Sequence, residues 1–177
     1  MREKLLHKLD LLNKNMEDIL AYAGSCPEED FNAAPSQGKW SPSQIINHLI
    51  LSEKYSLGYC RKKLSFSPIL KKAGMVSEFK SWLVQSYLLS PFKYKAPKGI
   101  STEDLPPADT LFSVTQKWKE VRKELESFLR EVPEEYLDKE VYKHPFGGRL
   151  SLSGMLLFFH AHFKNHEGQI KRALSKK

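Results

Sequence analysis

The chain has 177 residues, of which 41% are hydrophobic and 28% are charged. A chain of this length suits one domain with a real core, and these proportions exclude a fibrous or globally disordered protein. We therefore expect a single domain over residues 1–177. The formal net charge of +7 comes from dispersed lysines, without zinc-finger spacing or an aromatic RNA-binding motif, so a nucleic-acid-binding role is not favoured.

The apolar segments and the cysteines indicate the cellular compartment of the protein. No segment reaches the roughly 18 uninterrupted apolar residues of a membrane span, and charges interrupt the N-terminal stretch MREKLLHKLDLL too often for a secretory signal. Cys26 and Cys60 form no CxxC pair, which favours two reduced thiols. These features predict a soluble cytoplasmic protein without a membrane partner.

Apolar residues in steps of three and four predict two long helices in the first part of the chain. The first is expected over residues 5–23, where Leu5, Leu9, Leu12, Met16, Ile19 and Ala23 form one stripe. The second begins where Ser41 can cap, Pro42 fits the first helical position and Gln44 completes a capping box, and it runs to about Leu64. The stretch between them, CPEEDFNAAPSQG, has the composition of a loop.

Two further long helices are expected in the second half of the chain. One covers residues 111–128, opened by Pro107 and Asp109 and closed before Pro133, and the other covers residues 152–174 after HPFGGRLSLSG. Four helices of about twenty residues with little β alternation predict an all-α fold, an antiparallel four-helix bundle.

Residues 65–107 are expected to form a long irregular connection between the second and third helices. Within it, MVSEFKSWLVQSYLL is compatible with a short extra helix, whereas the proline-rich SPFKYKAPKGISTEDLPPAD is typical of extended chain. So long a connection in a compact domain either packs over the bundle or acts as a functional lid.

The segment HAHFKNHEGQI, residues 160–170, holds three of the six histidines. At about 100° per residue, His162 and His166 share one helix face with Gln169, whereas His160 points roughly 160° away from His162. An i, i+4 histidine pair is a standard way for a helix to offer two imidazole nitrogens to a metal ion. Structural or surface histidines are the ordinary alternative.

His48 is the candidate third ligand, on the second expected helix. It aligns with Tyr55 and Tyr59 on a polar and aromatic strip beside the apolar face, which is the lining expected of a pocket. A partly buried histidine whose ring is satisfied by a carbonyl or a tyrosine hydroxyl explains the same strip.

Two segments resemble motifs of the DinB-like superfamily (DinB/YfiT-like). Trp40 to Leu49 reads W-S-P-S-Q-I-I-N-H-L, similar to W-S-x-x-x-I-x-x-H-L in the family, and His162 to Ile170 reads H-F-K-N-H-E-G-Q-I, similar to H-x-x-x-H-x-x-Q-I. HPFGGRLSL and PFKYKAP also resemble this family, so the resemblance covers nearly the whole chain. It implies a four-helix bundle, in agreement with the apolar periodicity.

The resemblance implies a metal centre in which His48, His162 and His166 are the ligands, while His160 and His144 match no ligand position. Family members have been associated with divalent nickel, zinc or iron, with transfer of a low-molecular-weight thiol to an electrophile, and with hydrolysis of small molecules. Because members often dimerise, a homodimer is a further expectation.

Three neutral imidazoles leave an open position on a metal ion, where a bound water or thiolate can act as nucleophile. Tyr55, Tyr59 and Gln169 are the candidates for contacting the substrate or orienting a ligand. No catalytic base can be assigned, since Glu53 lies about 140° from His48 on the helical wheel and Glu167 is adjacent to a ligand rather than one turn away.

Two hypotheses follow from these residues. The first is a metal-dependent hydrolase or thiol S-transferase that acts on a small molecule in a cleft between the helices at 42–64 and 152–174. The second is a non-catalytic bundle that binds a ligand or partner around a vestigial metal site. The missing carboxylate beside the histidines favours the second hypothesis, and the three-histidine pattern favours the first.

Overall fold

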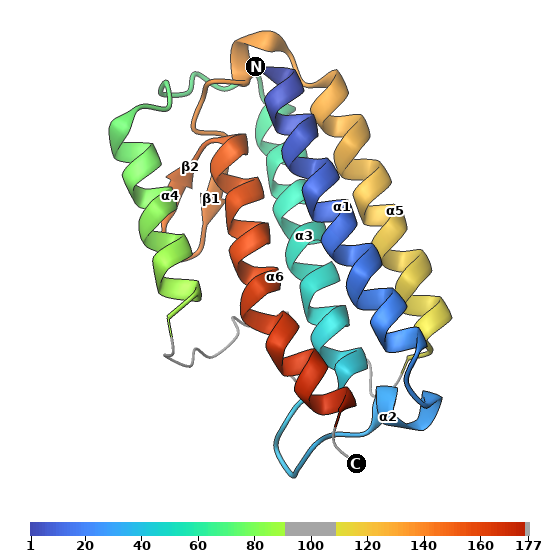
Figure 1. Cartoon of the computed structure of the whole chain (residues 1–177). Helices are drawn as coiled ribbons and strands as arrows, with labels where there is room; N and C mark the ends of the chain where they lie inside the picture. The colour runs from blue at the N-terminus through green and yellow to red at the C-terminus, as the bar shows by residue number, and fades with distance from the viewer. Residues whose placement is uncertain (91–108, 176–177) are drawn as a thin grey trace.

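Four long helices form the body of the computed structural model, which describes residues 1–90 and 109–175 (Figure 1). They are α1 (Arg2–Gly24), α3 (Pro42–Leu64), α5 (Leu111–Glu131) and α6 (Leu152–Leu174). Helices α1 and α6 run in one direction and α3 and α5 in the other (Figure 1). Each of the four helices contacts two of the others, in the cyclic order α1, α5, α3, α6, which confirms the prediction of an all-α four-helix bundle. The pairs α1/α5 and α3/α6 are antiparallel as expected, whereas α3 runs parallel to α5 and α1 parallel to α6 (Figure 1).

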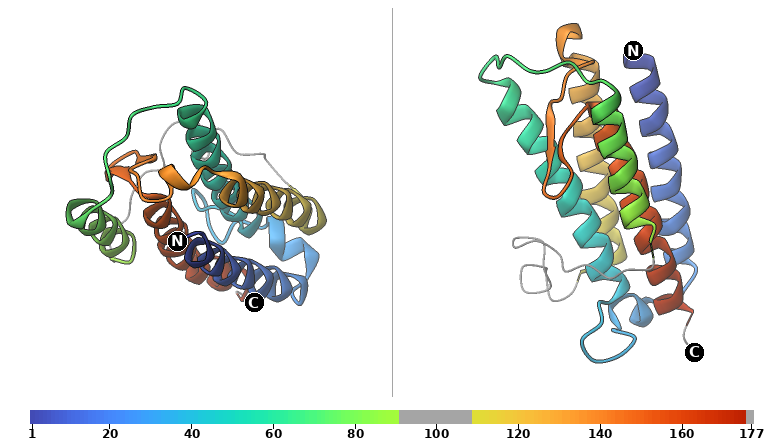
Figure 2. Two further views of the ribbon diagram at one scale, coloured as in Figure 1. Left: turned by 90° about the horizontal axis from the view of Figure 1, so that it is seen from above. Right: turned by 90° about the vertical axis from the view of Figure 1, so that its left-hand side faces the viewer.

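The connection between α3 and α5 contains a further helix, α4 (Met75–Leu88). Because α3 and α5 point the same way, the chain has to return along the bundle between them, and α4 runs in that return direction outside the four-helix ring (Figures 1 and 2). The short extra helix considered for this stretch is therefore present. The proline-rich remainder of the connection, residues 91–108, lies outside the described residues.

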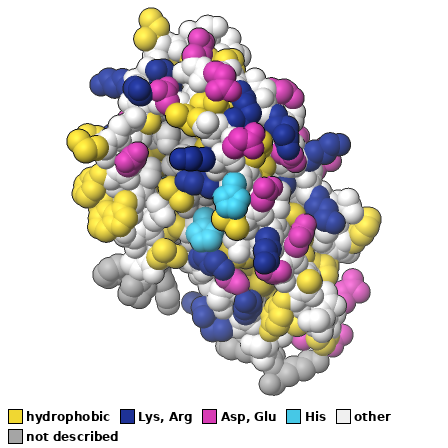
Figure 3. Space-filling view, turned by 45° about the horizontal axis from the view of Figure 1, so that its top comes forward, with side chains coloured by type: hydrophobic (Ala, Val, Ile, Leu, Met, Phe, Trp, Pro, Cys, Tyr) yellow, Lys and Arg dark blue, Asp and Glu magenta, His cyan; other side chains and the backbone are white. Residues whose placement is uncertain are grey.

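Helix α4 packs on α6 and on the strand that precedes α6. Its inner face carries the small buried residues Ser77, Ser81 and Val84. Gly154 of α6 allows this close approach, because a Cβ at Gly154 would lie 2.5 Å from Ser81 Oγ. The outer face of α4 is apolar and exposed (Figure 3), with Met75, Val76, Phe79, Trp82, Leu83 and Tyr87. The homodimer stays a prediction.

A short β-hairpin, which the sequence pattern did not predict, precedes α6. Strand β1 (Tyr142–His144) pairs antiparallel with β2 (Gly148–Leu150). Strands of three residues are too short to show an alternating pattern in the sequence. Gly148 supports the tight reversal, because its φ of +70° is a conformation that glycine adopts without steric cost.

Two short helical turns complete the described fold: α2 (Glu28–Asn32) and the 3-10 turn η2 (Glu134–Tyr136). Helix α2 lies in the stretch expected to be a loop, and it buries Phe31 against the bundle. A five-residue helix covers barely more than one turn, so the composition of this stretch gives no periodicity to detect. None of the described helices is both long enough and apolar enough to cross a bilayer.

The apolar core divides into two clusters along the bundle axis. One cluster includes Phe159 and the hairpin end of the bundle, and the other includes Phe163 and the end near α2. Between them, the buried Arg122 of α5 forms a two-pronged ion pair with the buried Glu53 of α3, with both N–O distances 2.7 Å. Trp118 Nε1 also donates to Glu53, at 3.2 Å. Polar side chains in the middle of the bundle therefore interrupt the core.

Candidate metal centre

His48 is fixed by the start of helix α3. The predicted capping box is present, since Gln44 N donates to Ser41 Oγ at 3.2 Å and Ser41 N donates to Gln44 Oε1 at 3.0 Å, with Pro42 following the cap. These bonds satisfy amide groups that a helix start otherwise leaves unpaired. They define the rotation of α3, which places the His48 ring toward α6, with 4% of the side chain exposed.

Helix α6 supplies the other two imidazoles. Ser151 caps its start by accepting from Gly154 N at 3.0 Å, and His162 and His166 follow one turn apart on the face turned to α3. His162 is buried, whereas His166 is only partly buried. His166 is therefore the most exposed of the three rings.

The three rings form a compact cluster. His48 Nε2 lies 3.0 Å from His162 Nε2, and one ligand nitrogen from each of His48, His162 and His166 lies within 4.8 Å of the others. The three pairs of ring centroids are 4.9, 5.1 and 4.9 Å apart, with interplanar angles between 69° and 79°. This geometry brings together the three histidines identified from the sequence.

The donor set fits a transition-metal ion. Zinc bound tetrahedrally at about 2.0–2.1 Å from each imidazole needs nitrogens about 3.4 Å apart, within the range of separations that the cluster spans. Three protein ligands leave a position for a water or a substrate, the arrangement typical of catalytic rather than structural zinc. Imidazole also suits nickel, copper and iron, so the ligands alone do not select the metal.

Burial keeps two of these imidazoles neutral at physiological pH. Burial lowers the pKa of His162 well below its ordinary value of 6.5, with smaller contributions from the charges of His166, His48 and His144. Burial, followed by the charge of His48, lowers the pKa of His166 to about 4. A neutral imidazole retains a lone pair for a metal ion.

Two aromatic rings enclose the cluster, and neither was among the site residues predicted from the sequence. Trp40 lies 4.9 Å from the His48 ring and stacks on the His166 ring at 6.3 Å, centroid to centroid. Phe158 stacks on His162 at 5.3 Å. Phe158 precedes His162 by one helical turn, so helical spacing contained a signal for it. Trp40 lies before the α3 cap, where periodicity gives no direction for its ring.

Gln169 lies where the sequence places it, beside a candidate ligand. Its Oε1 is 3.2 Å from His166 Nδ1. A second partner of this kind fixes the ring orientation of a metal-binding histidine and the nitrogen that faces the ion.

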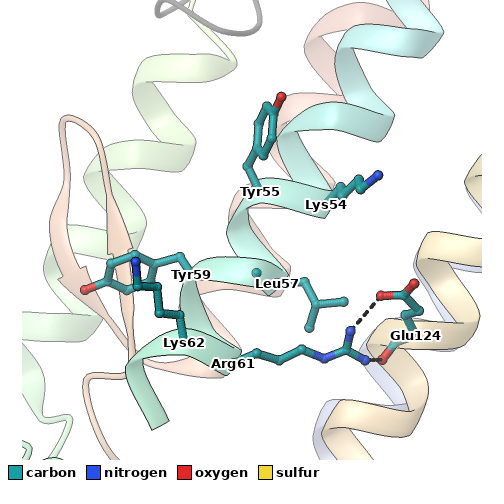
Figure 4. A pocket seen from close by; sticks show the side chains of 8 residues that line it. Lys54, Tyr55, Leu57, Tyr59, Arg61, Lys62 and Glu124 are labelled. Carbon is teal, nitrogen blue, oxygen red and sulfur yellow. Dashed lines mark hydrogen bonds and ion pairs between the residues drawn. The ribbon is translucent and has the colours of Figure 1, made fainter. Parts of the chain in front are cut away.

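Tyr55 and Tyr59 lie elsewhere on α3. Tyr55 is 56% exposed, and both tyrosines line an open hollow with Leu57 and Arg61, where Arg61 pairs with Glu124 of α5 at 2.7 Å (Figure 4). The Tyr59 side chain points to the hairpin (Figure 4) and its ring contacts Tyr142. At about 1.5 Å per helical residue, Tyr59 is about 16 Å along α3 from His48, so the structure does not bring it to the cluster.

His160 and His144 have other partners. His160 Nδ1 lies 3.4 Å from Asn15 Nδ2 on α1, on the flank away from the cluster. His144 Nδ1 accepts from the backbone amides of Phe146 and Gly147, at 3.2 and 2.9 Å. Its role is therefore to hold the hairpin turn.

The two glutamates weighed as catalytic bases are held by cations. Glu53 is bound by Arg122, and Glu167 pairs with Lys164 and Lys171 at 2.9 and 2.8 Å. Among the described residues, the group close enough to hold an ion contains histidines and no carboxylate.

The fold and these three histidines define a class: a four-helix-bundle protein with a candidate metal centre between two of its helices. A family model described as the DinB superfamily matches residues 11–170, and the chain belongs to that superfamily. The crystal structure of TT2238, described as a four-helix bundle protein, is similar in fold, with a TM-score of 0.56 and 16% identity over 97% of this chain and 99% of that one. No curated protein sequence matches the chain.

Proposed function

We propose that the chain is a metal-dependent enzyme in which His48, His162 and His166 hold one divalent nickel, zinc or iron ion that activates a small-molecule substrate. The observation that carries the proposal is the convergence of three imidazole nitrogens within 4.8 Å of one another, from helices far apart in the sequence. Membership of the DinB superfamily supports it.

The residues around the cluster have distinct roles in such a site. The ion, when bound, would supply a Lewis-acidic position that stabilises a thiolate or a hydroxide near neutral pH. Trp40 and Phe158 cover the histidine rings and keep bulk water from the ligand nitrogens. The partly exposed His166 side provides access for a substrate.

Thiol transfer is favoured over hydrolysis by the surroundings of the cluster. Glu53 and Glu167 are both engaged by cations, so neither is free to act as a general base toward a water molecule. A thiol has an ordinary pKa of about 8.5, which a nearby cation lowers, so it needs less help to deprotonate. We therefore propose a low-molecular-weight thiol as co-substrate, transferred to an electrophilic carbon.

Metal titration tests the first part of the proposal. Protein stripped with a chelator and titrated with Zn²⁺ or Ni²⁺ in a calorimeter should bind one ion per chain. Alanine at His48, His162 or His166 should weaken binding by more than the roughly 10–100-fold that loss of an outer partner costs. His160→Ala is the matched control on α6 and should bind normally. An intact wild-type fold that takes up no metal at neutral pH would contradict the proposal.

Turnover assays test the second part. The metal-loaded protein should accelerate the reaction of a small thiol with a chlorinated or epoxide electrophile, and His162→Ala should lose this activity. Acceleration of ester hydrolysis alone would place the chain among hydrolases. Stoichiometric metal binding without turnover in either panel would favour the non-catalytic bundle.

A further inference from the structure

A chain of three side chains links the end of α4 to the candidate centre. Asn165 of α6 donates from Nδ2 to the carbonyl oxygen of Leu88, the last residue of α4. Gln169 donates from Nε2 to Asn165 Oδ1 at 3.3 Å. Gln169 Oε1 in turn lies 3.2 Å from His166 Nδ1. Asn165 is therefore the connecting residue between α4 and a candidate ligand.

The carbonyl oxygen of Leu88 permits only one direction for this series of hydrogen bonds. A backbone carbonyl only accepts hydrogen bonds, so the Asn165 atom that faces it must be the amide nitrogen. The Asn165 oxygen then faces Gln169 and accepts a hydrogen bond from the Gln169 amide nitrogen. This leaves Gln169 Oε1 facing His166. An amide oxygen also only accepts, so His166 Nδ1 must carry the hydrogen.

The direction of these hydrogen bonds determines whether Nε2 of His166 carries a hydrogen. A neutral imidazole carries one hydrogen, on one of its two ring nitrogens. With the hydrogen on Nδ1, the Nε2 lone pair is available to an ion. A free histidine has no such fixed choice, because its two neutral tautomers interconvert.

We propose that Asn165 is a positioning residue that acts through Gln169 to hold His166 in the Nδ1–H tautomer before a metal arrives. The inference deepens the proposed function, since it concerns one ligand of the same site. It assigns a role to the end of α4, whose Leu88 carbonyl sets the direction of every hydrogen bond that follows. The seating of α4 on α6 is thereby connected to the ligand.

The test reads the tautomer directly in the metal-free protein. Long-range ¹H–¹⁵N NMR at pH 7.5 should show His166 of the wild type with a protonated Nδ1 and an unprotonated Nε2. Asn165→Leu removes both contacts, so His166 should become a mixture of tautomers and zinc should bind about 10–100-fold more weakly. Asn165→Asp cannot donate to Leu88 but still accepts from Gln169, so it should retain the wild-type tautomer.

Asn15→Leu is the matched control, because Asn15 faces the non-ligand His160 and its loss should change neither readout. Gln169→Leu provides a second variant if Asn165→Leu does not fold, and it should show the same mixture. A wild-type tautomer and wild-type zinc affinity in a folded Asn165→Leu or Gln169→Leu protein would overturn the inference. Failure of the wild type to bind zinc would instead overturn the proposed function, while the NMR spectra would still report the tautomer.

Discussion

His48 Nε2 and His162 Nε2 lie 3.0 Å apart across 114 residues of sequence. At this distance two lone pairs would repel each other, so in the metal-free protein one ring donates a hydrogen to the other. A metal ion requires a lone pair from each of the two nitrogens, and it takes the place of that hydrogen. The folded chain therefore holds the two rings close to the separation that a shared ion requires.

Metal should stabilise the fold, because the ligands come together only in the native state. With free zinc at 100 times its dissociation constant, the free energy of unfolding should rise by about 2.7 kcal/mol. The measurement is chemical denaturation of the wild type and of His48→Ala, each with zinc and with a chelator. His48→Ala should show no difference between the two conditions, and an equal gain in both proteins would place the bound zinc elsewhere.

Tryptophan fluorescence should report metal binding through Trp40. Its ring lies 4.9 Å from His48 and 6.3 Å from His166, centroid to centroid, so paramagnetic Ni²⁺ at the cluster should quench it. Zn²⁺ has a closed d shell and serves as the diamagnetic control. Trp40→Phe should lose most of the Ni²⁺-dependent quenching, although two other tryptophans remain. Quenching that persists in this variant would locate the ion near another tryptophan.

Stability of the metal-free protein should fall with pH below about 6.5, in part because of His144. Burial lowers the pKa of His144 from 6.5 to about 4. Between these values the unfolded chain binds a proton that the folded chain does not, so the stability is fully present above 6.5 and is lost as the pH falls toward 4. Each unit of pKa shift corresponds to about 1.4 kcal/mol.

His144→Asn should reduce this pH dependence. Its Oδ1 can accept from the amides of Phe146 and Gly147, but it does not titrate. Denaturation at pH 7.5 and pH 5 should therefore show a smaller difference for this variant than for the wild type. His7→Asn, at an exposed site on α1, should behave as the wild type does. If the stability difference between pH 7.5 and pH 5 is the same in His144→Asn as in the wild type, His144 does not cause the pH dependence.

The Glu53–Arg122 pair should behave as a structural element. Replacing one partner, as in Glu53→Leu or Arg122→Met, should destabilise the fold by about 3–5 kcal/mol, because a buried charge is left without its partner. The double variant should lose much less than the sum of the two. Denaturation of all four proteins measures this coupling, and zinc titration of the folded double variant should match that of the wild type. Loss of zinc affinity there would connect Glu53 to the centre.

Gly154→Ala should weaken the seating of α4. The new Cβ would lie 2.5 Å from Ser81 Oγ and 3.1 Å from Leu150 Cβ, and such overpacking costs about 1–3 kcal/mol. Ser81→Ala removes the nearer of these atoms, so the double variant should recover part of the loss in chemical denaturation. No recovery would indicate that the contact with Leu150 dominates.

Helical periodicity predicted the four long helices. The resemblance of two motifs to the DinB-like superfamily grouped His48, His162 and His166 as one set of candidate ligands. A helical wheel also placed Glu53 away from His48, but it contained no information on Arg122, because that partner comes from another helix. The same wheel aligned Tyr55 and Tyr59 with His48, yet an angle gives no distance along the axis. The hairpin and α2 are shorter than the periods that would reveal them.

The polar layer in the middle of the bundle leaves two apolar parts that can open locally with different free energies. His162 lies at their boundary, between Phe159 of one cluster and Phe163 of the other. An ion shared by His162 and His48 is lost when either part opens. Metal occupancy would thus make the two parts unfold as one cooperative unit, and the influence of a small site would extend over the length of the bundle.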